Sequence, residues 1–155
     1  MTTVPQGEST KSKGAAITEH ECLQAKRANA TGLKPVVFVH GLWLLPSSWD
    51  RWAKLFEEEG FTALTPGWPD DPEDVEQANV HPHVFAGKSI GQVADHFEEI
   101  VRVLNIKPAI IGHSFGGLLA QILAGRGRSA ATVAIDREAD CGGYWEPNVW
   151  MHHSL

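Results

Sequence analysis

The sequence predicts an α/β protein with a doubly wound, mostly parallel sheet. Two runs of β-branched, aliphatic and aromatic residues, "PVVFVH" (35–40) and "PAIIGH" (108–113), are typical of strands that are buried on both faces. Helical patterns separate these strands, and the alternation of strand and helix continues along the chain. This order predicts parallel strands joined by helical crossovers, which cover both faces of the sheet.

Local signals set the expected bounds of the elements. Ser47 or Ser48 is predicted to cap the first helix of the core, which Gly60 ends in a left-handed turn. Ser89 and Gln92 form a capping box in front of a helix whose apolar residues recur at helical spacing. The expected strands span 35–40, 61–66, 108–113 and 131–136, and the expected helices 46–60, 90–104 and 115–125.

Composition divides the chain into three parts. Residues 1–33 are polar and are interpreted as a flexible N-terminal arm, in which only "EHECLQAKRA" favours a helix. Residues 34–136 carry the alternating elements and form the α/β core. Residues 137–155 show no clear period and are interpreted as a divergent C-terminal tail.

The bulk properties exclude several classes of partner. The chain has 155 residues and a formal net charge of −6, whereas nucleic acids and anionic membranes attract basic surfaces. No apolar run approaches the roughly 20 residues of a membrane span, and the N-terminus lacks the apolar segment of a secretory signal. Cys22 and Cys141 match neither a disulfide nor a zinc spacing. We therefore expect a cytoplasmic protein without a nucleic-acid or membrane partner.

The stretch "IGHSFGG" places Ser114 between two glycines at the spacing G-x-S-x-G. Glycines 112 and 116 allow a sharp turn from a strand into a helix, with close packing around it. The turn lifts Ser114 above the carboxyl edge of the sheet, where the following helix directs its free N–H groups and positive dipole end. This pattern indicates a serine nucleophile.

A second turn, "VFVHGLW", is expected to meet the serine. A buried strand ends at His40, Gly41 allows a tight turn, and the N–H groups of Leu42 and Trp43 are then expected to face a ligand. The expected strand order 2-1-3-4 puts the first and third strands side by side, so that their carboxyl ends form one crevice. Two separate sequence features therefore predict the same site beside Ser114.

The motifs "VVFVHGLW" and "IGHSFGG", with the strand that follows them, resemble the α/β-hydrolase superfamily of the esterase, lipase and haloperoxidase-like type. The resemblance covers residues 34–136. It implies a partial α/β-hydrolase fold of about four strands and Ser114 as the nucleophile. It also implies an oxyanion hole built from the N–H groups of Phe115 and Leu42, a small uncharged ester-like substrate and no cofactor.

The acid and the histidine of such enzymes follow the serine on later loops, and only 41 residues follow Ser114 here. We therefore expect the chain to be truncated after the strand that follows the nucleophile helix. Asp136, at the end of that strand, is the candidate acid, and the alternative is a strand-end or helix-capping aspartate. His153, beside His152, is the candidate base if the tail folds back over the sheet edge, and the alternative is a mobile terminus.

Two function classes remain open. The first is a serine hydrolase that transfers an acyl group from an ester or similar bond to Ser114 and then to water. The second is a catalytically incomplete hydrolase fragment that acts as a binding or assembly module, or that has no function alone. A covalent serine probe distinguishes the two classes.

The remaining histidines point to no further chemistry. His40 belongs to the H-G turn, where a structural hydrogen bond is favoured over a role as base. His81, His83 and His96 lack further ligands at suitable spacing, so no metal site is expected.

The strand "ATVAID" (131–136) is expected to lie at an edge of the sheet, with unpaired N–H and C=O groups. Such an edge recruits a partner. We therefore predict that the chain forms a homo-oligomer through this edge, aggregates, or covers the edge with residues 137–155.

Overall fold

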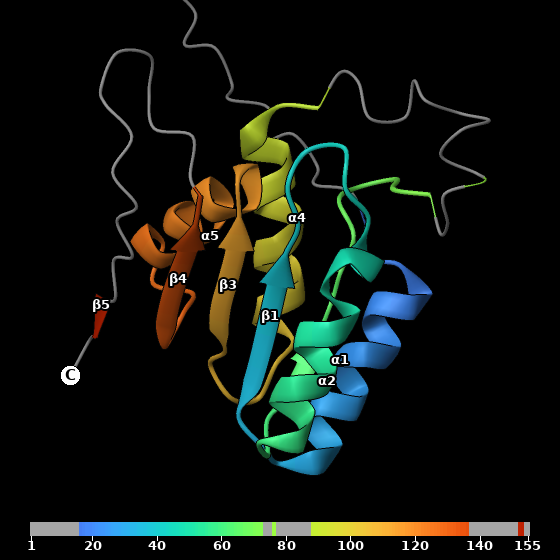
Figure 1. The fold of residues 1–155 in the computed structure, drawn as a ribbon, viewed down its shortest axis with the longest axis vertical. Helices are drawn as coiled ribbons and strands as arrows, with labels where there is room; N and C mark the ends of the chain where they lie inside the picture. Colours follow the sequence, from blue (N-terminus) through green and yellow to red (C-terminus); the bar gives the residue numbers. More distant parts are fainter. Residues whose placement is uncertain (1–15, 73–75, 77–87, 137–151, 154–155) are drawn as a thin grey trace, which may run out of the picture.

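The structure, a computed structural model, describes residues 16–72, 76, 88–136 and 152–153. Four parallel strands form its sheet, and a short antiparallel strand lies on one edge (Figure 1). The order is β2-β1-β3-β4-β5, which confirms the predicted order of the four parallel strands. The strands are β1 (Pro35–Val39), β2 (Thr62–Leu64), β3 (Ala109–His113), β4 (Ala131–Ile135) and β5 (His152–His153).

The sheet is covered on both faces, as a doubly wound fold requires. Val37 and Val39 of β1 pack into the core with α1, α4 and α5, and Val36 and Phe38 pack on the opposite face with α2 and η1. Residues alternate between the two faces along a strand, so all five residues of β1 are buried. The helices are α1 (Glu19–Thr31), η1 (Pro46–Trp49), α2 (Asp50–Glu58), α4 (Ile90–Arg102) and α5 (Phe115–Gly125).

Capping explains where the longer helices begin. Ser89 and Gln92 form the capping box that the sequence predicts, in which the Gln92 N–H donates to the Ser89 hydroxyl at 3.2 Å. Gly60 follows α2 with a φ of 86°, which confirms the predicted left-handed turn. The prediction that Ser47 or Ser48 caps the next helix is wrong. Both serines lie within the 3₁₀ turn η1, and α2 begins only at Asp50 without a side-chain cap.

The N-terminal region corrects the interpretation of residues 1–33 as a flexible arm. Helix α1 forms over the segment that favoured a helix, with a complete capping box between Thr18 and Glu21. Its residues Ala25 and Ala28 are buried in the same core cluster as α4 and α5. Residues 1–15 lie outside the described residues.

A buried ion pair joins α1 to α4. His96 Nε2 lies 3.0 Å from Glu21 Oε1, and both side chains are almost completely buried. Burial by itself raises the pKa of Glu21. Hydrogen bonds from His96 and Thr18, with the attraction of the His96 charge, outweigh this effect, so the net pKa is lowered from 4.5.

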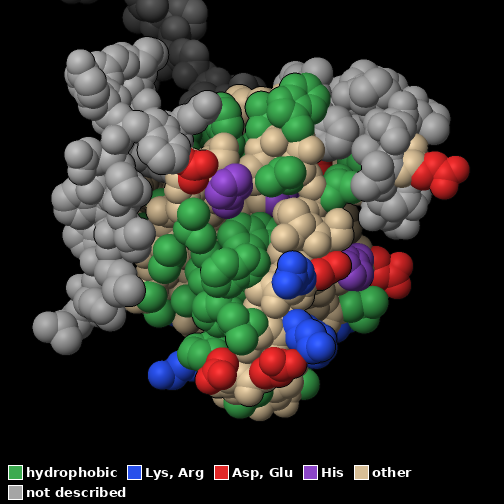
Figure 2. Space-filling model, in the orientation of Figure 1, with side chains coloured by type: hydrophobic (Ala, Val, Ile, Leu, Met, Phe, Trp, Pro, Cys, Tyr) green, Lys and Arg blue, Asp and Glu red, His purple; other side chains and the backbone are tan. Residues whose placement is uncertain are grey.

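One side of the molecule carries exposed apolar side chains. Figure 2 shows hydrophobic side chains gathered in the middle of the face that is turned to the viewer. Trp52 and Leu55 of α2 are each 48% exposed. Val133 and Ile135 of β4 pack on the same side of the sheet and are only partly buried. The surface therefore offers apolar area to a partner or a second copy.

The edge strand β4 has a short partner. β5 pairs with it antiparallel, with His153 opposite Ala131 and His152 opposite Thr132. Coverage of the edge by the tail is one of the three predicted outcomes, and it extends here over two pairs of residues. The rest of the tail, residues 137–151 and 154–155, lies outside the described residues.

Candidate active site

Ser114 occupies a strained turn at the carboxyl end of β3. Its φ of 55° and ψ of −123° lie in a region that residues other than glycine rarely adopt. The Ser114 N–H donates to the Ile135 carbonyl of β4 at 2.9 Å, and its own carbonyl accepts the Gly117 N–H at 2.8 Å. These backbone bonds hold the serine where β3 passes directly into α5. The strand-to-helix turn that the sequence predicts is therefore present.

Two glycines make this turn possible. A Cβ at Gly112 would collide with the Gly116 carbonyl, and a Cβ at Gly116 would collide with the carbonyls of Val39, at the end of β1, and His40, which follows it. Both approaches involve backbone atoms, which have little freedom to move. The pattern G-x-S-x-G is thus a steric requirement of the way α5 starts against β1 and β3.

The H-G turn after β1 lies against the serine. A Cβ built on Gly41 would stand 3.2 Å from both the Ser114 Cβ and the His113 carbonyl oxygen. This proximity follows from the pairing of β1 with β3, in which Val39 stands opposite Gly112. The structure therefore brings together the two turns that the sequence placed at one site.

The predicted oxyanion donors flank this contact. Leu42 follows Gly41, and Phe115 is the first residue of α5. Among the described residues, neither backbone N–H donates to an acceptor of the protein. The first N–H groups of a helix have no intrahelical partner, which suits Phe115 to an anionic oxygen.

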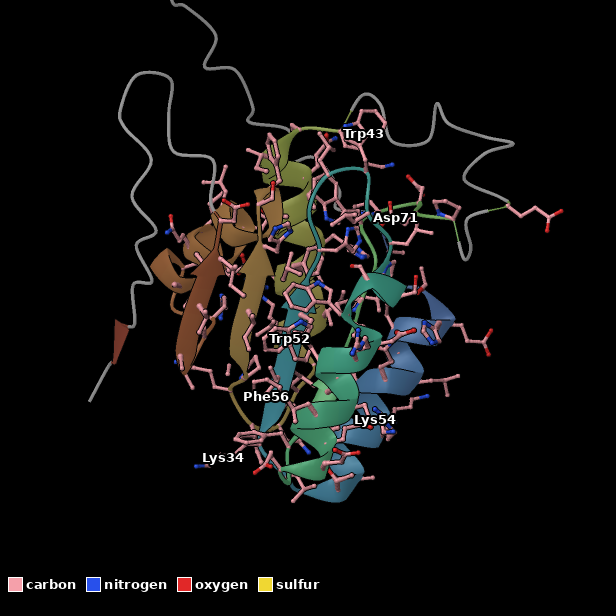
Figure 3. The ribbon with its side chains drawn as sticks, viewed as in Figure 1. Lys34, Trp43, Trp52, Lys54, Phe56 and Asp71 are labelled. Atoms are coloured by element: carbon pink, nitrogen blue, oxygen red, sulfur yellow. The ribbon has the colours of Figure 1, made fainter. Side chains whose placement is uncertain are left out.

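A buried network supports the H-G turn. His40 is 2% exposed, its Nδ1 donates to the Gly41 carbonyl at 2.9 Å, and its Nε2 lies 2.9 Å from Asp71 Oδ2. The Trp68 indole N–H donates to the His40 carbonyl at 3.2 Å. Figure 3 shows Asp71 at the end of the sheet toward which the strands point. His40 thus makes the structural hydrogen bond that its sequence position favours.

Sequence reasoning did not identify Asp71. It lies in an acidic loop with four further carboxylates between Asp70 and Glu76, and nothing in the sequence separates it from them. Only the fold shows that Asp71 alone of the described loop carboxylates reaches a buried imidazole.

Asp136 lies at the carboxyl edge, as predicted, but it faces a different imidazole from the one expected. Its Oδ2 is 3.8 Å from His113 Nε2, and both side chains are substantially exposed. Its φ of 48° makes it, with Ser114, one of the few left-handed residues of the described chain other than glycine.

The structure does not bring His153 to the serine. β5 holds the backbone of His153 beside Ala131, at the amino end of β4. Ser114 is level with the opposite end, because its neighbour His113 stands opposite Ile135. Four residues of strand, about 13 Å, separate the two levels.

Among the described residues, no group of three His, Cys, Asp or Glu side chains could hold a metal ion. His96 is instead paired with Glu21, and His81 and His83 lie outside the described residues. No helix of the described chain has the length and apolar character needed to cross a membrane.

Comparison with known families agrees with this geometry. The model of the Alpha/beta hydrolase family matches residues 36–153, which include both turns of the site. The chain belongs to the α/β-hydrolase family. No curated protein sequence matches it.

Solved α/β-hydrolase structures share the fold at low sequence identity. An extracellular α/β-hydrolase from a Paenibacillus species matches with a TM-score of 0.54 and 22% identity, over 71% of this chain and 43% of its own. A monoacylglycerol lipase from Paleococcus ferrophilus matches with 0.53 and 22%, over 66% and 38%. Epoxide hydrolase A from Mycobacterium thermoresistibile matches with 0.51 and 22%, over 66% and 32%. The α/β-hydrolase described here spans less than half the length of each of these structures.

Proposed function

We propose that this chain is a serine hydrolase of ester or similar acyl bonds, with Ser114 as the nucleophile. The observation that carries the proposal is the left-handed backbone of Ser114 at the carboxyl end of β3, with Gly41 against its Cβ. This turn stands at the point where the ends of β1 and β3 meet. Leu42 follows Gly41 and Phe115 follows Ser114 in the chain, so their N–H groups are the proposed donors to an oxyanion formed there.

The chemistry that these groups support is acyl transfer. The Ser114 hydroxyl attacks the carbonyl carbon of the ester, and the carbonyl oxygen becomes the anion of a tetrahedral intermediate. The N–H groups of Leu42 and Phe115 donate to that oxygen, and each such donor is worth about 10²–10³ in kcat in a serine protease. The alcohol leaves, and water then releases the acid from the serine.

Asp136 and His153 are the proposed acid and base, but they stand differently with respect to the serine. Asp136 is already at the carboxyl edge, where His113 is the described imidazole that it faces. His153 would have to leave its place beside Ala131 to take the hydroxyl proton from Ser114. The proposal therefore includes slow turnover, because a positioned base contributes about 10²–10⁴ to such reactions.

A fluorophosphonate probe tests the nucleophile with a single attack, without the second step that turnover needs. We expect the intact mass of the wild-type chain to increase by one phosphonyl group, with the label mapped to Ser114. Ser114→Ala should abolish the label. Ser48→Ala is the matched control, because Ser48 is an exposed serine outside the site, and this variant should be labelled like the wild type.

The alternative function is a binding or assembly module derived from a hydrolase. It is favoured by the pairing of His153 at the far end of β4, which leaves Ser114 without the predicted base. Failure of the probe to label Ser114 in a folded wild-type chain would support this alternative and contradict the hydrolase proposal.

A further inference from the structure

The buried pair of His40 and Asp71 contacts the turn that carries one oxyanion donor. We propose that these two side chains are positioning residues, which fix the peptide between Gly41 and Leu42 so that the Leu42 N–H faces the oxygen of the intermediate. This inference rests on the proposed function, because it assigns a role within the same oxyanion hole.

The first step concerns the peptide itself. His40 Nδ1 donates to the Gly41 carbonyl at 2.9 Å, and the Leu44 N–H donates to the same oxygen at 3.2 Å. A carbonyl oxygen can only accept, so Nδ1 carries a proton. The peptide bond is planar, and no cis bond occurs in the described chain. The Leu42 N–H therefore points away from the Gly41 carbonyl, and holding the carbonyl fixes the direction of the donor.

The second step concerns what holds the imidazole. Asp71 Oδ2 lies 2.9 Å from His40 Nε2, a contact whose angles do not meet those of a hydrogen bond. The side chains are 2% and 5% exposed, so the carboxylate and the imidazole edge are packed against each other away from water. The Trp68 ring stacks on the imidazole with centroids 5.9 Å apart and an interplanar angle of 20°. The imidazole is thus held at its edge and on its face.

The third step concerns Asp71. Its Oδ2 accepts the backbone N–H of Trp68 at 2.7 Å, and its own backbone N–H donates to the Trp68 carbonyl at 3.0 Å. The carboxylate is therefore fixed by its own loop before it meets the imidazole. The chain of contacts runs from Asp71 through His40 and Gly41 to Leu42, and no member of it touches the acyl group except the last.

Two substitutions at one position separate this role from simple stabilisation of the loop. The amide nitrogen of asparagine can take the place of Nδ1, and that of glutamine can take the place of Nε2. His40→Asn can therefore keep the donor to Gly41 and lose the contact with Asp71. His40→Gln can keep the contact with Asp71 and lose the donor to Gly41. Positioning through the peptide predicts that the two variants differ.

The assay uses a Ser114→Cys background, so that no base is needed. The introduced thiolate attacks the carbonyl of p-nitrophenyl acetate, p-nitrophenolate leaves and a thioester forms, through an intermediate whose oxyanion needs donors. The same thiolate displaces iodide from iodoacetamide without forming an oxyanion. Peptide mapping by mass spectrometry gives the rates of acylation and of alkylation at position 114. The ratio of the acylation rate to the alkylation rate measures how much the oxyanion hole accelerates acylation. Cys22, a free and exposed thiol, supplies the reference ratio within the same molecule.

In the parent protein, Ser114→Cys, we expect the ratio of the acylation rate to the alkylation rate to be higher at position 114 than at Cys22. His40→Gln should lower it by about tenfold or more, in line with the loss of one oxyanion donor. His40→Asn should keep it within about threefold of the parent, and the nearly isosteric Asp71→Asn should lower it a few-fold by loosening the imidazole. Asp71→Asn keeps an oxygen that can accept the Trp68 N–H, so it tests the proposal even if the His40 variants do not fold.

The matched control is His96→Gln, which alters an equally buried imidazole on α4 that faces the Glu21 carboxylate of α1. It should change the melting temperature without changing the ratio. Equal ratios in Ser114→Cys, His40→Gln and Asp71→Asn would overturn the inference. An equal fall of the ratio in His40→Gln and His40→Asn would also overturn it. Either result would leave the proposed function standing. A parent ratio no higher than that of Cys22 would overturn the oxyanion hole, and the inference with it.

Discussion

Gly116→Ala tests the backbone contact on which the serine turn depends. The added methyl group would stand where the Val39 and His40 carbonyl oxygens lie, and both belong to β1 or to the turn that follows it. Overpacking costs about 1–3 kcal/mol where side chains can adjust, and backbone adjusts less, so we expect a loss of at least about 3 kcal/mol in the free energy of unfolding. For a domain of this size, that corresponds to a fall of at least about 6 °C in Tm.

Gly125→Ala is the matched control at the other end of the same helix. Apart from its chain neighbours and the backbone of its own helix, no described atom lies within 4 Å of a Cβ at Gly125, and its φ is outside the left-handed region. Alanine should therefore raise the free energy of unfolding by about 0.5–1 kcal/mol. Thermal and urea unfolding, followed by circular dichroism, give both values. A Gly116→Ala variant as stable as the wild type would refute the close approach of α5 to β1.

Turnover, acid stability and self-association can be measured on the same purified chain. Hydrolysis of p-nitrophenyl butyrate should be slow, because the base contribution of about 10²–10⁴ is missing, and it should fall to the rate without protein in Ser114→Ala, which lacks the proposed nucleophile. Hydrolysis that is equal in the wild type and in Ser114→Ala would instead support the binding-module alternative. Because the pKa of Glu21 is lowered in the folded protein, its carboxylate stabilises the fold at pH values above 4.5, the ordinary pKa. This stabilisation is lost as the pH falls through the lower pKa of the folded state. Glu21→Gln should therefore make the free energy of unfolding fall less steeply with acid, and a slope equal to that of the wild type would exclude the effect. Light scattering should show association that increases with concentration and weakens in Trp52→Lys, because Trp52 is half exposed on an apolar face; a monomer at every concentration would argue against it.

The core of the fold could be predicted from the sequence because its signals are local. The run "PVVFVH" is apolar at consecutive positions, which only a strand covered on both faces can bury, and all of β1 is buried. The capping box of Ser89 and Gln92 spans three residues and needs no tertiary partner. The elbow at Ser114 follows in the same way, since its glycines are required wherever such a turn occurs.

The parts that were missed depend on distant partners. Helix α1 has a weak apolar face, because its buried residues include Ala25, Ala28 and Glu21. Glu21 is buried only because His96, seventy-five residues away, meets it. Asp71 is one of several similar carboxylates until the fold brings it to His40. In each case the burial of a polar group is specified by a contact that no local pattern shows.

The two halves of the proposed serine hydrolase site depend on different kinds of structure. The turns that carry the proposed nucleophile and the proposed oxyanion donors are fixed by backbone, through the pairing of β1 with β3 and the close approaches at Gly41 and Gly116. The base is a side chain that must be delivered from elsewhere, and β5 holds His153 at the far end of β4. Acylation of a reactive thiol at position 114 therefore reports the first half, and turnover by the native serine reports the second. An active oxyanion hole with slow turnover would mean that the backbone half forms without the base, because strand pairing and the glycine contacts do not involve a histidine side chain.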